Sequence, residues 1–139
     1  MSEKVQVIIF FQDTNHLEVL LLQTNNQRGA FWQNITGSVE MNDSNLSYAA
    51  IREAKEETGI NLPSVIQLNH SFEYHNSIRN INYKEYIFYS VLNEKPIVQL
   101  SNEHQNYCWK NVLEVNQPDF KFESNYIGFC EALKQVKTK

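Results

Sequence analysis

A run of acidic residues lies near the middle of the chain, in the segment Arg52-Glu53-Ala54-Lys55-Glu56-Glu57-Thr58-Gly59-Ile60. If this segment is a helix, Glu56 and Glu57 follow Glu53 by three and four residues, so the three carboxylates share one face. Converging carboxylates are the ligands that hard divalent cations such as Mg²⁺ and Mn²⁺ take. The spacing therefore predicts a metal site, although a solvated surface is the simpler interpretation of a glutamate pair on its own.

The neighbours of these acids predict a helix packed on a sheet. Small or apolar residues recur on the face opposite the glutamates, at Leu46, Ala50 and Ala54. This stripe allows the helix to approach a sheet closely. Asp43 or Ser44 is expected to cap the N-terminus of the helix. Gly59 is expected to cap its C-terminus, where a left-handed residue is needed.

The segment resembles the signature of the Nudix hydrolases, in which a glycine-led loop, a helix and a second loop end in Arg-Glu-x-x-Glu-Glu-x-Gly. The resemblance is strong from Arg52 to Ile60 and looser upstream. This chain has Asp43 where the family has a glutamate, and it carries one extra residue between Asp43 and Arg52. The loop that enters the helix therefore differs in length, and the role of Asp43 stays open.

The resemblance implies a metal-dependent hydrolase of phosphoanhydrides, with Mg²⁺ as the cofactor and Mn²⁺ as the alternative. Glu56 and Glu57 are the implied metal ligands, and Glu53 is implied as a ligand or as the general base. The family pattern adds the carbonyl of Gly37 as a backbone ligand. Arg52 points away from the acidic face, so we expect it to pair with a glutamate and orient it. Such a set of groups can neutralise phosphate charge and activate a water.

A second stretch, from Phe31 to Glu40, narrows the resemblance within the family. It is similar to the corresponding run of the bacterial dihydroneopterin triphosphate pyrophosphatases, which remove pyrophosphate from a pterin triphosphate on the way to folate. Further matches to that group are Asn102-Glu103-His104, Tyr107, Trp109 and Ser124-Asn125. The resemblance implies that Glu103 lies at the metal site and acts in catalysis. His104 either assists proton transfer or shapes the loop.

Aromatic and basic residues supply the candidate substrate contacts. Phe31 and Trp32 lie a few residues before Gly37, so they are expected to grip a planar ring, although aromatic residues more often pack in a core. The candidate phosphate contacts are Arg28, Arg79, Lys84 and Lys110. Among them we assign Arg28 and Lys110 to substrate binding.

The best interpretation is a pyrophosphohydrolase that acts on dihydroneopterin triphosphate. One alternative is an enzyme that clears oxidised nucleoside triphosphates or cleaves dinucleoside polyphosphates. The other is a catalytically silent Nudix-like module that binds a nucleotide. The complete set of glutamates argues against the silent module, because a protein that only binds has no need of converging carboxylates.

Composition limits the partners of the protein. The 139 residues carry a net charge of −4, which argues against nucleic acid held by a basic surface. The apolar run at 5–11 is too short for a membrane span and lacks the cleavage site of a signal peptide. Two distant cysteines predict neither a disulfide framework nor a zinc site. We expect a cytoplasmic protein with a small-molecule phosphoanhydride substrate, and a homodimer is left open.

The order of elements predicts one domain, residues 1–139, of the α/β class. Strands are expected at 5–11, 18–24, 30–36, 66–74, 83–92 and 107–110, with a short edge segment at 97–100. Apolar residues at helical spacing predict a second helix at 123–136. Strands that alternate with two helices fit a mixed sheet covered on both faces. The family resemblance implies the same arrangement, the Nudix-type α/β/α sandwich.

Overall fold

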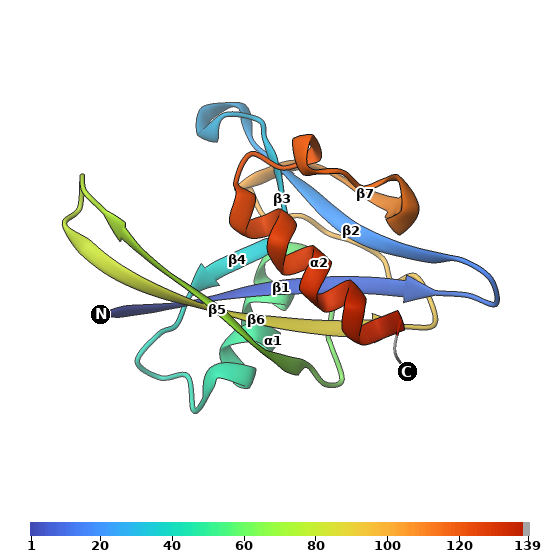
Figure 1. Ribbon diagram of the computed structural model, residues 1–139, viewed down its shortest axis with the longest axis horizontal. Helices are drawn as coiled ribbons and strands as arrows, with labels where there is room; N and C mark the ends of the chain where they lie inside the picture. Colours follow the sequence, from blue (N-terminus) through green and yellow to red (C-terminus); the bar gives the residue numbers. More distant parts are fainter. Residues whose placement is uncertain (138–139) are drawn as a thin grey trace.

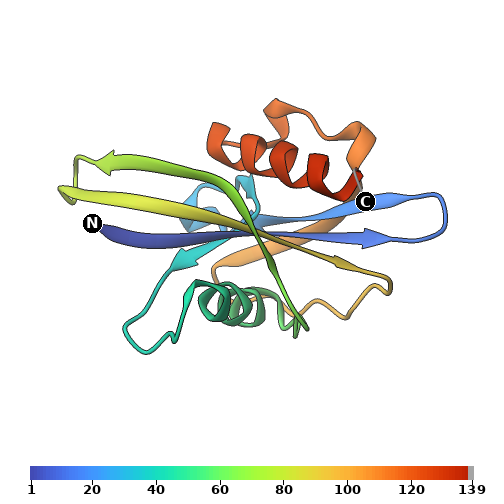
Figure 2. The same cartoon turned by 60° about the horizontal axis from the view of Figure 1, so that its bottom comes forward.

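A computed structural model describes residues 1–137 of the chain. Within these residues, seven strands form one sheet and a helix covers each of its faces (Figures 1 and 2). The strands are β1 (Ser2–Gln12), β2 (Leu17–Thr24), β3 (Trp32–Gln33), β4 (Ile35–Ser38), β5 (Ile66–Asn76), β6 (Ile81–Leu92) and β7 (His104–Asn111). The helices are α1 (Leu46–Thr58) and α2 (Glu123–Lys137), with short 3₁₀ turns η1 (Asn26–Arg28), η2 (Val112–Glu114) and η3 (Gln117–Asp119). This arrangement confirms the predicted α/β/α sandwich.

The sheet is mixed, and β1 lies at its centre. The strand order is β3-β2-β1-β6-β5, with β7 paired to β2. β1 runs parallel to β6 and antiparallel to β2 and β4. Its first half pairs with β4 through Lys4 to Val7, and its second half pairs with β2 through Phe10 to Gln12. The chain that leaves β4 therefore starts beside the first residues of β1 and leads directly into α1.

Two apolar clusters hold the helices on the sheet. Side chains alternate along β1, so Val5, Val7 and Ile9 pack under α1 while Ile8 and Phe10 pack under α2. The α1 side adds the predicted alanines of the helix, which are fully buried. The α2 side is richer in rings and includes Tyr89, Phe120 and Phe129. A central strand buried on both faces explains why β1 is almost continuously apolar from Val5 to Phe11.

The ends of α1 differ in part from the prediction. The N-cap is Asn45, whose side-chain oxygen accepts a hydrogen bond of 2.8 Å from the backbone N–H of Tyr48. Asp43 and Ser44 do not cap the helix, because the entering loop is longer and the Asp43 carboxylate binds an arginine instead. Gly59 is the expected C-cap, with a left-handed φ of 74°.

The predicted edge segment at 97–100 is wrong, because these residues form no strand. They run along the C-terminal end of α1, where Gln99 N–H donates to the carbonyl of Thr58 at 2.8 Å and Ser101 N–H donates to that of Glu57 at 3.3 Å. The last carbonyls of a helix have no partner within it, so this segment satisfies them. The same path delivers Glu103 to the end of α1. Neither helix of the described chain has the length and apolar character needed to cross a membrane.

Candidate active site

A cleft of about 590 Å³ lies between the C-terminal half of α1, the end of β4 and the segment before β7. Five glutamates line it: Glu40, Glu53, Glu56, Glu57 and Glu103. Three cationic side chains line it as well: Lys4, Arg28 and Arg79. The remaining lining residues are small or polar and include Gly37. The cleft therefore combines anions that suit divalent cations with cations that suit phosphate oxygens.

The three glutamates of α1 differ in their exposure. Glu53 and Glu57 are buried, with 8% and 3% of their surface exposed, whereas Glu56 is exposed at the rim. Gly37 on β4 makes the burial of Glu53 possible, because a Cβ at this position would overlap the Glu53 carboxyl group. Two of the three carboxylates of the acidic face are thus turned into the protein, and the third, that of Glu56, faces solvent. A solvated helix surface does not describe this arrangement.

Glu57 lies in the least favourable environment for a charge. Burial raises the pKa of its carboxyl well above 4.5, and the neighbouring Glu53 charge raises this pKa further. Among the described residues no N–H or hydroxyl group donates to either of its carboxylate oxygens, and the Glu53 carboxyl is close enough to share a proton with it. Burial likewise raises the pKa of Glu53, although Arg52 opposes that shift. Carboxylates buried without donors need a proton or a cation, so this donor set fits a divalent metal.

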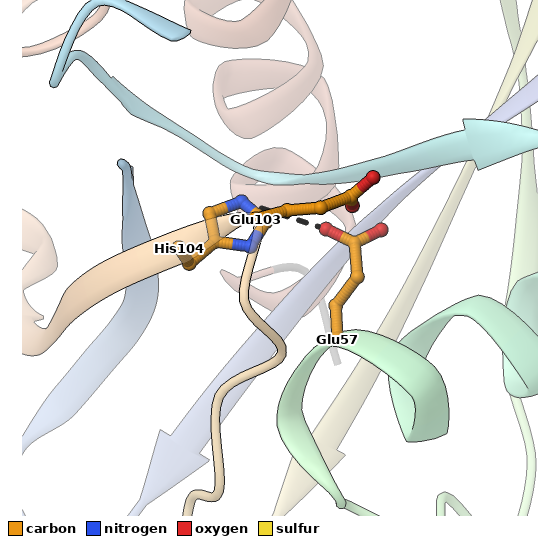
Figure 3. Close-up of side chains that lie close together, drawn as sticks. All are labelled: Glu57, Glu103 and His104. Carbon is orange, nitrogen blue, oxygen red and sulfur yellow. Dashed lines mark ion pairs between the residues drawn. The ribbon is translucent and has the colours of Figure 1, made fainter. Parts of the chain in front are cut away.

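Glu57, Glu103 and His104 approach one another from two segments that are far apart in the sequence (Figure 3). One possible ligand atom of each lies within 4.8 Å of those of the other two. The Nε2 atom of His104 is 3.6 Å from Oε1 of Glu57. Burial lowers the pKa of His104, and the Arg28 charge lowers it further. The imidazole is therefore favoured in its neutral form.

Arg52 holds the acidic face in place. Its guanidinium donates to both oxygens of Asp43 at 2.8 and 2.9 Å, and to the carbonyl of Ser38 at 2.9 Å. Its Nη1 donates to Glu53 at 3.0 Å and to Glu56 at 3.1 Å. The expected pairing with a glutamate is thus present twice. The fork of hydrogen bonds to Asp43 fixes the guanidinium in one orientation.

Asp43 is the residue whose role the sequence left open. Only 1% of its side chain is exposed, and its hydrogen bonds from Arg52 lower the pKa of its carboxyl. A backbone hydrogen bond of 2.8 Å from the N–H of Glu40 fixes its position. Asp43 does not line the cleft, but despite the extra loop residue it binds Arg52, which in turn binds Glu53 and Glu56.

Arg28 and Glu103 meet across one side of the cleft, with Nη1 of Arg28 3.7 Å from Oε2 of Glu103. Asn25 connects the loops that carry them. Its side chain accepts a hydrogen bond of 2.9 Å from the backbone N–H of Arg28 and donates one of 2.9 Å to the carbonyl of Asn102. Its backbone N–H donates to the carbonyl of Glu103 at 2.9 Å. A single asparagine thereby fixes the distance between a basic and an acidic residue.

Three residues that the sequence assigned to substrate binding lie outside the set that lines the cleft. Phe31 packs edge to face on Phe122, with ring centroids 5.3 Å apart. Trp32 packs against the apolar cluster under α2. The ammonium of Lys110 is 3.0 Å from a carboxylate oxygen of Asp119. The places of Trp32 and Lys110 follow from β3 and β7, which pair with β2 and not with β4.

Lys4 is the cationic residue of the cleft that the sequence did not predict. It lies on β1 directly opposite Ser38 of β4, and Ser38 is the residue that follows Gly37. Its ammonium also lies 4.6 Å from the centre of the Tyr83 ring. A lysine near the start of a chain carries no signal of such a role, because only strand register brings it to the acids.

Comparison with known proteins places these features in a family. Residues 2–129 match the family model of the NUDIX domain. Dihydroneopterin triphosphate diphosphatase of Haemophilus influenzae is 32% identical over 120 residues, which cover 78% of this chain and 73% of that protein. The solved dihydroneopterin triphosphate pyrophosphohydrolase of E. coli is similar with a TM-score of 0.74 and 27% identity, over 91% of each chain. An Ap4A hydrolase of C. elegans is similar in fold, with a TM-score of 0.81 and 21% identity over the whole of both chains.

Proposed function

This chain belongs to the NUDIX domain family and is a hydrolase of that family, and from this premise we propose that it releases pyrophosphate from dihydroneopterin triphosphate. The observation that carries the proposed chemistry is the buried Glu57 carboxylate, which receives no hydrogen bond from an N–H or hydroxyl group of the described residues and lies beside Glu53 and Glu103 in a cleft with three cationic side chains. The choice of substrate rests on similarity to the H. influenzae enzyme and on the matches around Phe31–Glu40 and Glu103.

Four glutamates, Glu53, Glu56, Glu57 and Glu103, together with the carbonyl of Gly37, are the groups that would hold Mg²⁺ or Mn²⁺. Divalent cations bound there would neutralise charge on the phosphate oxygens and lower the pKa of the attacking water. Arg52 keeps Glu53 and Glu56 in fixed positions through the hydrogen bonds described above. Glu53 or Glu103, whichever does not bind the metal, would accept the proton of the attacking water.

The cationic side chains of the cleft would bind the triphosphate. Arg28 keeps the role that the sequence assigned to it, because it lines the cleft opposite the acids of α1. Lys4 and Arg79 take the place of Lys110, whose ammonium pairs with Asp119. Three cations offset part of the charge of a polyanion that enters a cleft with five glutamates.

A substrate panel with Mg²⁺ tests the proposal. The panel contains dihydroneopterin triphosphate, the common and oxidised deoxynucleoside triphosphates and diadenosine tetraphosphate, and both pyrophosphate and orthophosphate are measured. We expect pyrophosphate release and the highest kcat/KM for dihydroneopterin triphosphate. The Glu103→Gln variant should lose that activity, whereas Lys110→Ala should retain it. Preference for an oxidised purine triphosphate would contradict the proposed substrate. No cleavage of any compound with either Mg²⁺ or Mn²⁺ would contradict the proposed reaction.

A further inference from the structure

We propose that Asn25 is a positioning residue of this site, which couples the phosphate contact of Arg28 to the metal contact of Glu103. The inference rests on the proposed function, because it takes Arg28 to bind the triphosphate and Glu103 to bind the cation. Asn25 is not among the residues that line the cleft, so it acts only through these two. Its hydrogen bonds, its place in the sheet and the chemistry of its amide lead to this assignment.

Arg28 and Glu103 lie on short turns, which fix a side chain less firmly than a long helix or strand does. Arg28 is the last residue of η1, and Glu103 lies in the turn that precedes β7. Both side chains are about half exposed, at 45% and 56%. Loops are the more mobile parts of a fold, and functional groups must be held within roughly 0.5 Å of their productive geometry. The two turns therefore need an anchor.

The side-chain amide of Asn25 bonds to both turns at once. Its Oδ1 accepts a hydrogen bond of 2.9 Å from the backbone N–H of Arg28 and caps η1. Its Nδ2 donates to the carbonyl of Asn102 at 2.9 Å, on the residue that precedes Glu103. An asparagine amide offers one acceptor and one donor side by side, whereas an ionised aspartate only accepts. The two partners on opposite sides therefore use the whole functional group of this asparagine.

The turn that carries Glu103 is also aimed by a β-bulge where β7 meets the end of β2. Thr24 pairs with His104, although the register of the preceding pairs would place it opposite Gln105. One extra residue reverses the face to which the next side chains point, and it turns His104 toward α1. Asn25 follows Thr24 directly, and its backbone N–H donates to the carbonyl of Glu103 at 2.9 Å. Asn25 therefore holds the chain at the point where the bulge redirects it.

The two hydrogen bonds of the amide have separate consequences. The bond to Asn102 restrains the turn of Glu103, so its loss should weaken cation binding by about 10-fold, the low end of the range for groups that support a metal site. The bond from Arg28 restrains η1, so its loss should raise KM for the triphosphate by about fivefold, the change that corresponds to a typical N-cap. Serine at position 25 keeps an N-cap oxygen and lacks the amide donor, whereas alanine lacks both.

The test compares Asn25→Ser and Asn25→Ala with wild type in two measurements. Isothermal titration with Mn²⁺, without substrate, gives the metal affinity. Steady-state kinetics at saturating Mg²⁺ gives KM for dihydroneopterin triphosphate. We expect both variants to bind Mn²⁺ about 10-fold more weakly and only Asn25→Ala to show the higher KM. Neither substitution removes the backbone N–H that donates to Glu103, so both measurements report on the side chain.

Asn111→Ala is the matched control. Asn111 is half-buried like Asn25, and its Oδ1 accepts a hydrogen bond of 2.9 Å from the N–H of Leu113 as the N-cap of η2. It lies at the opposite end of β7 from the cleft and does not line it. This variant loses the same kind of cap, so we expect a lower Tm with unchanged Mn²⁺ affinity and unchanged KM.

A double variant shows whether Asn25 acts through Glu103. In the Glu103→Gln background, Asn25→Ser should weaken Mn²⁺ binding much less than it does in wild type, because the carboxylate that it positions is already gone. Equal weakening in both backgrounds would contradict the inference, since it would indicate a general loss of structure. Wild-type Mn²⁺ affinity in both single variants would contradict it as well.

Failure of the proposed function is recognised separately, because it appears as absent pyrophosphate release by wild type. Wild type that releases pyrophosphate while the Asn25 variants match it in Mn²⁺ affinity and KM would keep the proposed function and remove the positioning role of Asn25.

Discussion

Two groups of buried polar side chains lie under different helices of this protein. The cleft cluster consists of Glu53, Glu57 and His104 near the C-terminal end of α1. The α2 cluster consists of Gln6, Asn34, Glu85 and Asn125 near the N-terminal end of α2. All seven residues are at most 8% exposed, and each cluster contains at least one glutamate. They differ in how their polar atoms are satisfied.

The α2 cluster is closed by its own hydrogen bonds. Gln6 donates to Glu85 at 2.8 Å and accepts a hydrogen bond of 2.7 Å from the side chain of Asn34. Asn34 also donates its backbone N–H to the Asn125 side chain at 2.7 Å. Gly128 makes room for this network, because a Cβ there would overlap the Gln6 side chain. Within the α2 cluster, only Oδ1 of Asn34 lacks a partner in the described structure.

The cleft cluster leaves its most buried acid without donors. Buried polar side chains therefore serve two different purposes in this protein. A network that satisfies itself ties strands to a helix, whereas a set of unsatisfied acids is built to receive something that the chain does not contain. Substitutions should therefore affect stability in one cluster and chemistry in the other.

The largest expected effect is on catalysis. Glu57→Gln keeps the size of the side chain and removes the charge that would hold a cation. Removal of one preorganised electrostatic group typically lowers the rate by about 10²–10³-fold. Steady-state turnover with Mg²⁺ measures the loss, and circular dichroism confirms the fold. Near-normal turnover of this variant would show that the cleft cluster has no catalytic role.

A smaller loss is expected from Gly37→Ala, which changes no charged group. The added methyl would overlap the Glu53 carboxyl group and displace it. Displacement of a supporting group typically costs about 10–100-fold in activity or metal affinity. Turnover and Mn²⁺ affinity should fall together. The double variant Gly37→Ala, Glu53→Gln should lose less than the sum of the single variants in free energy, because both act on one carboxylate.

Substitution in the α2 cluster should act mainly on stability. Asn125→Ala leaves the backbone N–H of Asn34 without its acceptor in a buried place. An unsatisfied buried group costs about 1–3 kcal/mol of unfolding free energy. Urea denaturation measures this change, with exposed Asn61→Ala as the control, for which we expect less than about 0.5 kcal/mol. Turnover per folded molecule should stay within a few-fold of wild type, and a loss of several hundred-fold would contradict the division between the clusters.

The smallest expected effect is a gain of stability in the metal-free protein. Because burial raises the folded-state pKa of Glu57, the folded protein binds this proton more tightly than the unfolded chain does. Its stabilising contribution is present below the ordinary pKa of 4.5 and is lost as pH rises through the raised value. The Glu57→Gln variant has no carboxyl to ionise at this position, so it does not lose this stability as pH rises. Its Tm in EDTA should therefore exceed that of wild type by an amount that grows from pH 5 to pH 8. Each kcal/mol corresponds to roughly 2–4 °C for a domain somewhat larger than this one.

Thermal melts in the presence of Mg²⁺ supply the control for that prediction. A cation that binds the folded state stabilises wild type by mass action, and the variant should gain less. A Tm difference that stays constant with pH would show that the Glu57 carboxyl does not titrate differently in the folded and unfolded chains.

Much of the fold could be predicted because its signals are local. The apolar run at 5–11 predicts a buried strand, and the alanine stripe predicts the buried side of α1. Gly59 predicts the end of that helix because a glycine adopts the left-handed conformation of a C-cap without steric cost. Asn45 was not predicted as the N-cap, because Asp43 and Ser44 cap equally well in isolation and only the arginine that takes Asp43 decides between them.

The kinds of residue in the candidate site could be predicted from the sequence, but their burial and their positions relative to one another could not. The spacing of Glu53, Glu56 and Glu57 determined that their carboxylates share a helix face, because a helix repeats every 3.6 residues whatever surrounds it. The sequence did not determine that Glu56 would be exposed while the other two are buried. For Glu53, burial depends on the approach of Gly37 on β4, which leaves room for its carboxyl group.

What only the tertiary structure decided is which distant residues meet these acids. The register of β1 against β4 brings Lys4 to the cleft, and the path along the end of α1 brings His104 to Glu57. The pairing of β3 and β7 with β2 takes Trp32 and Lys110 elsewhere. Sequence spacing is a local property, whereas strand order and register depend on the burial of the whole sheet. The sequence therefore predicts the type of chemistry from the glutamates, and the strand order and register decide which other residues lie beside those glutamates.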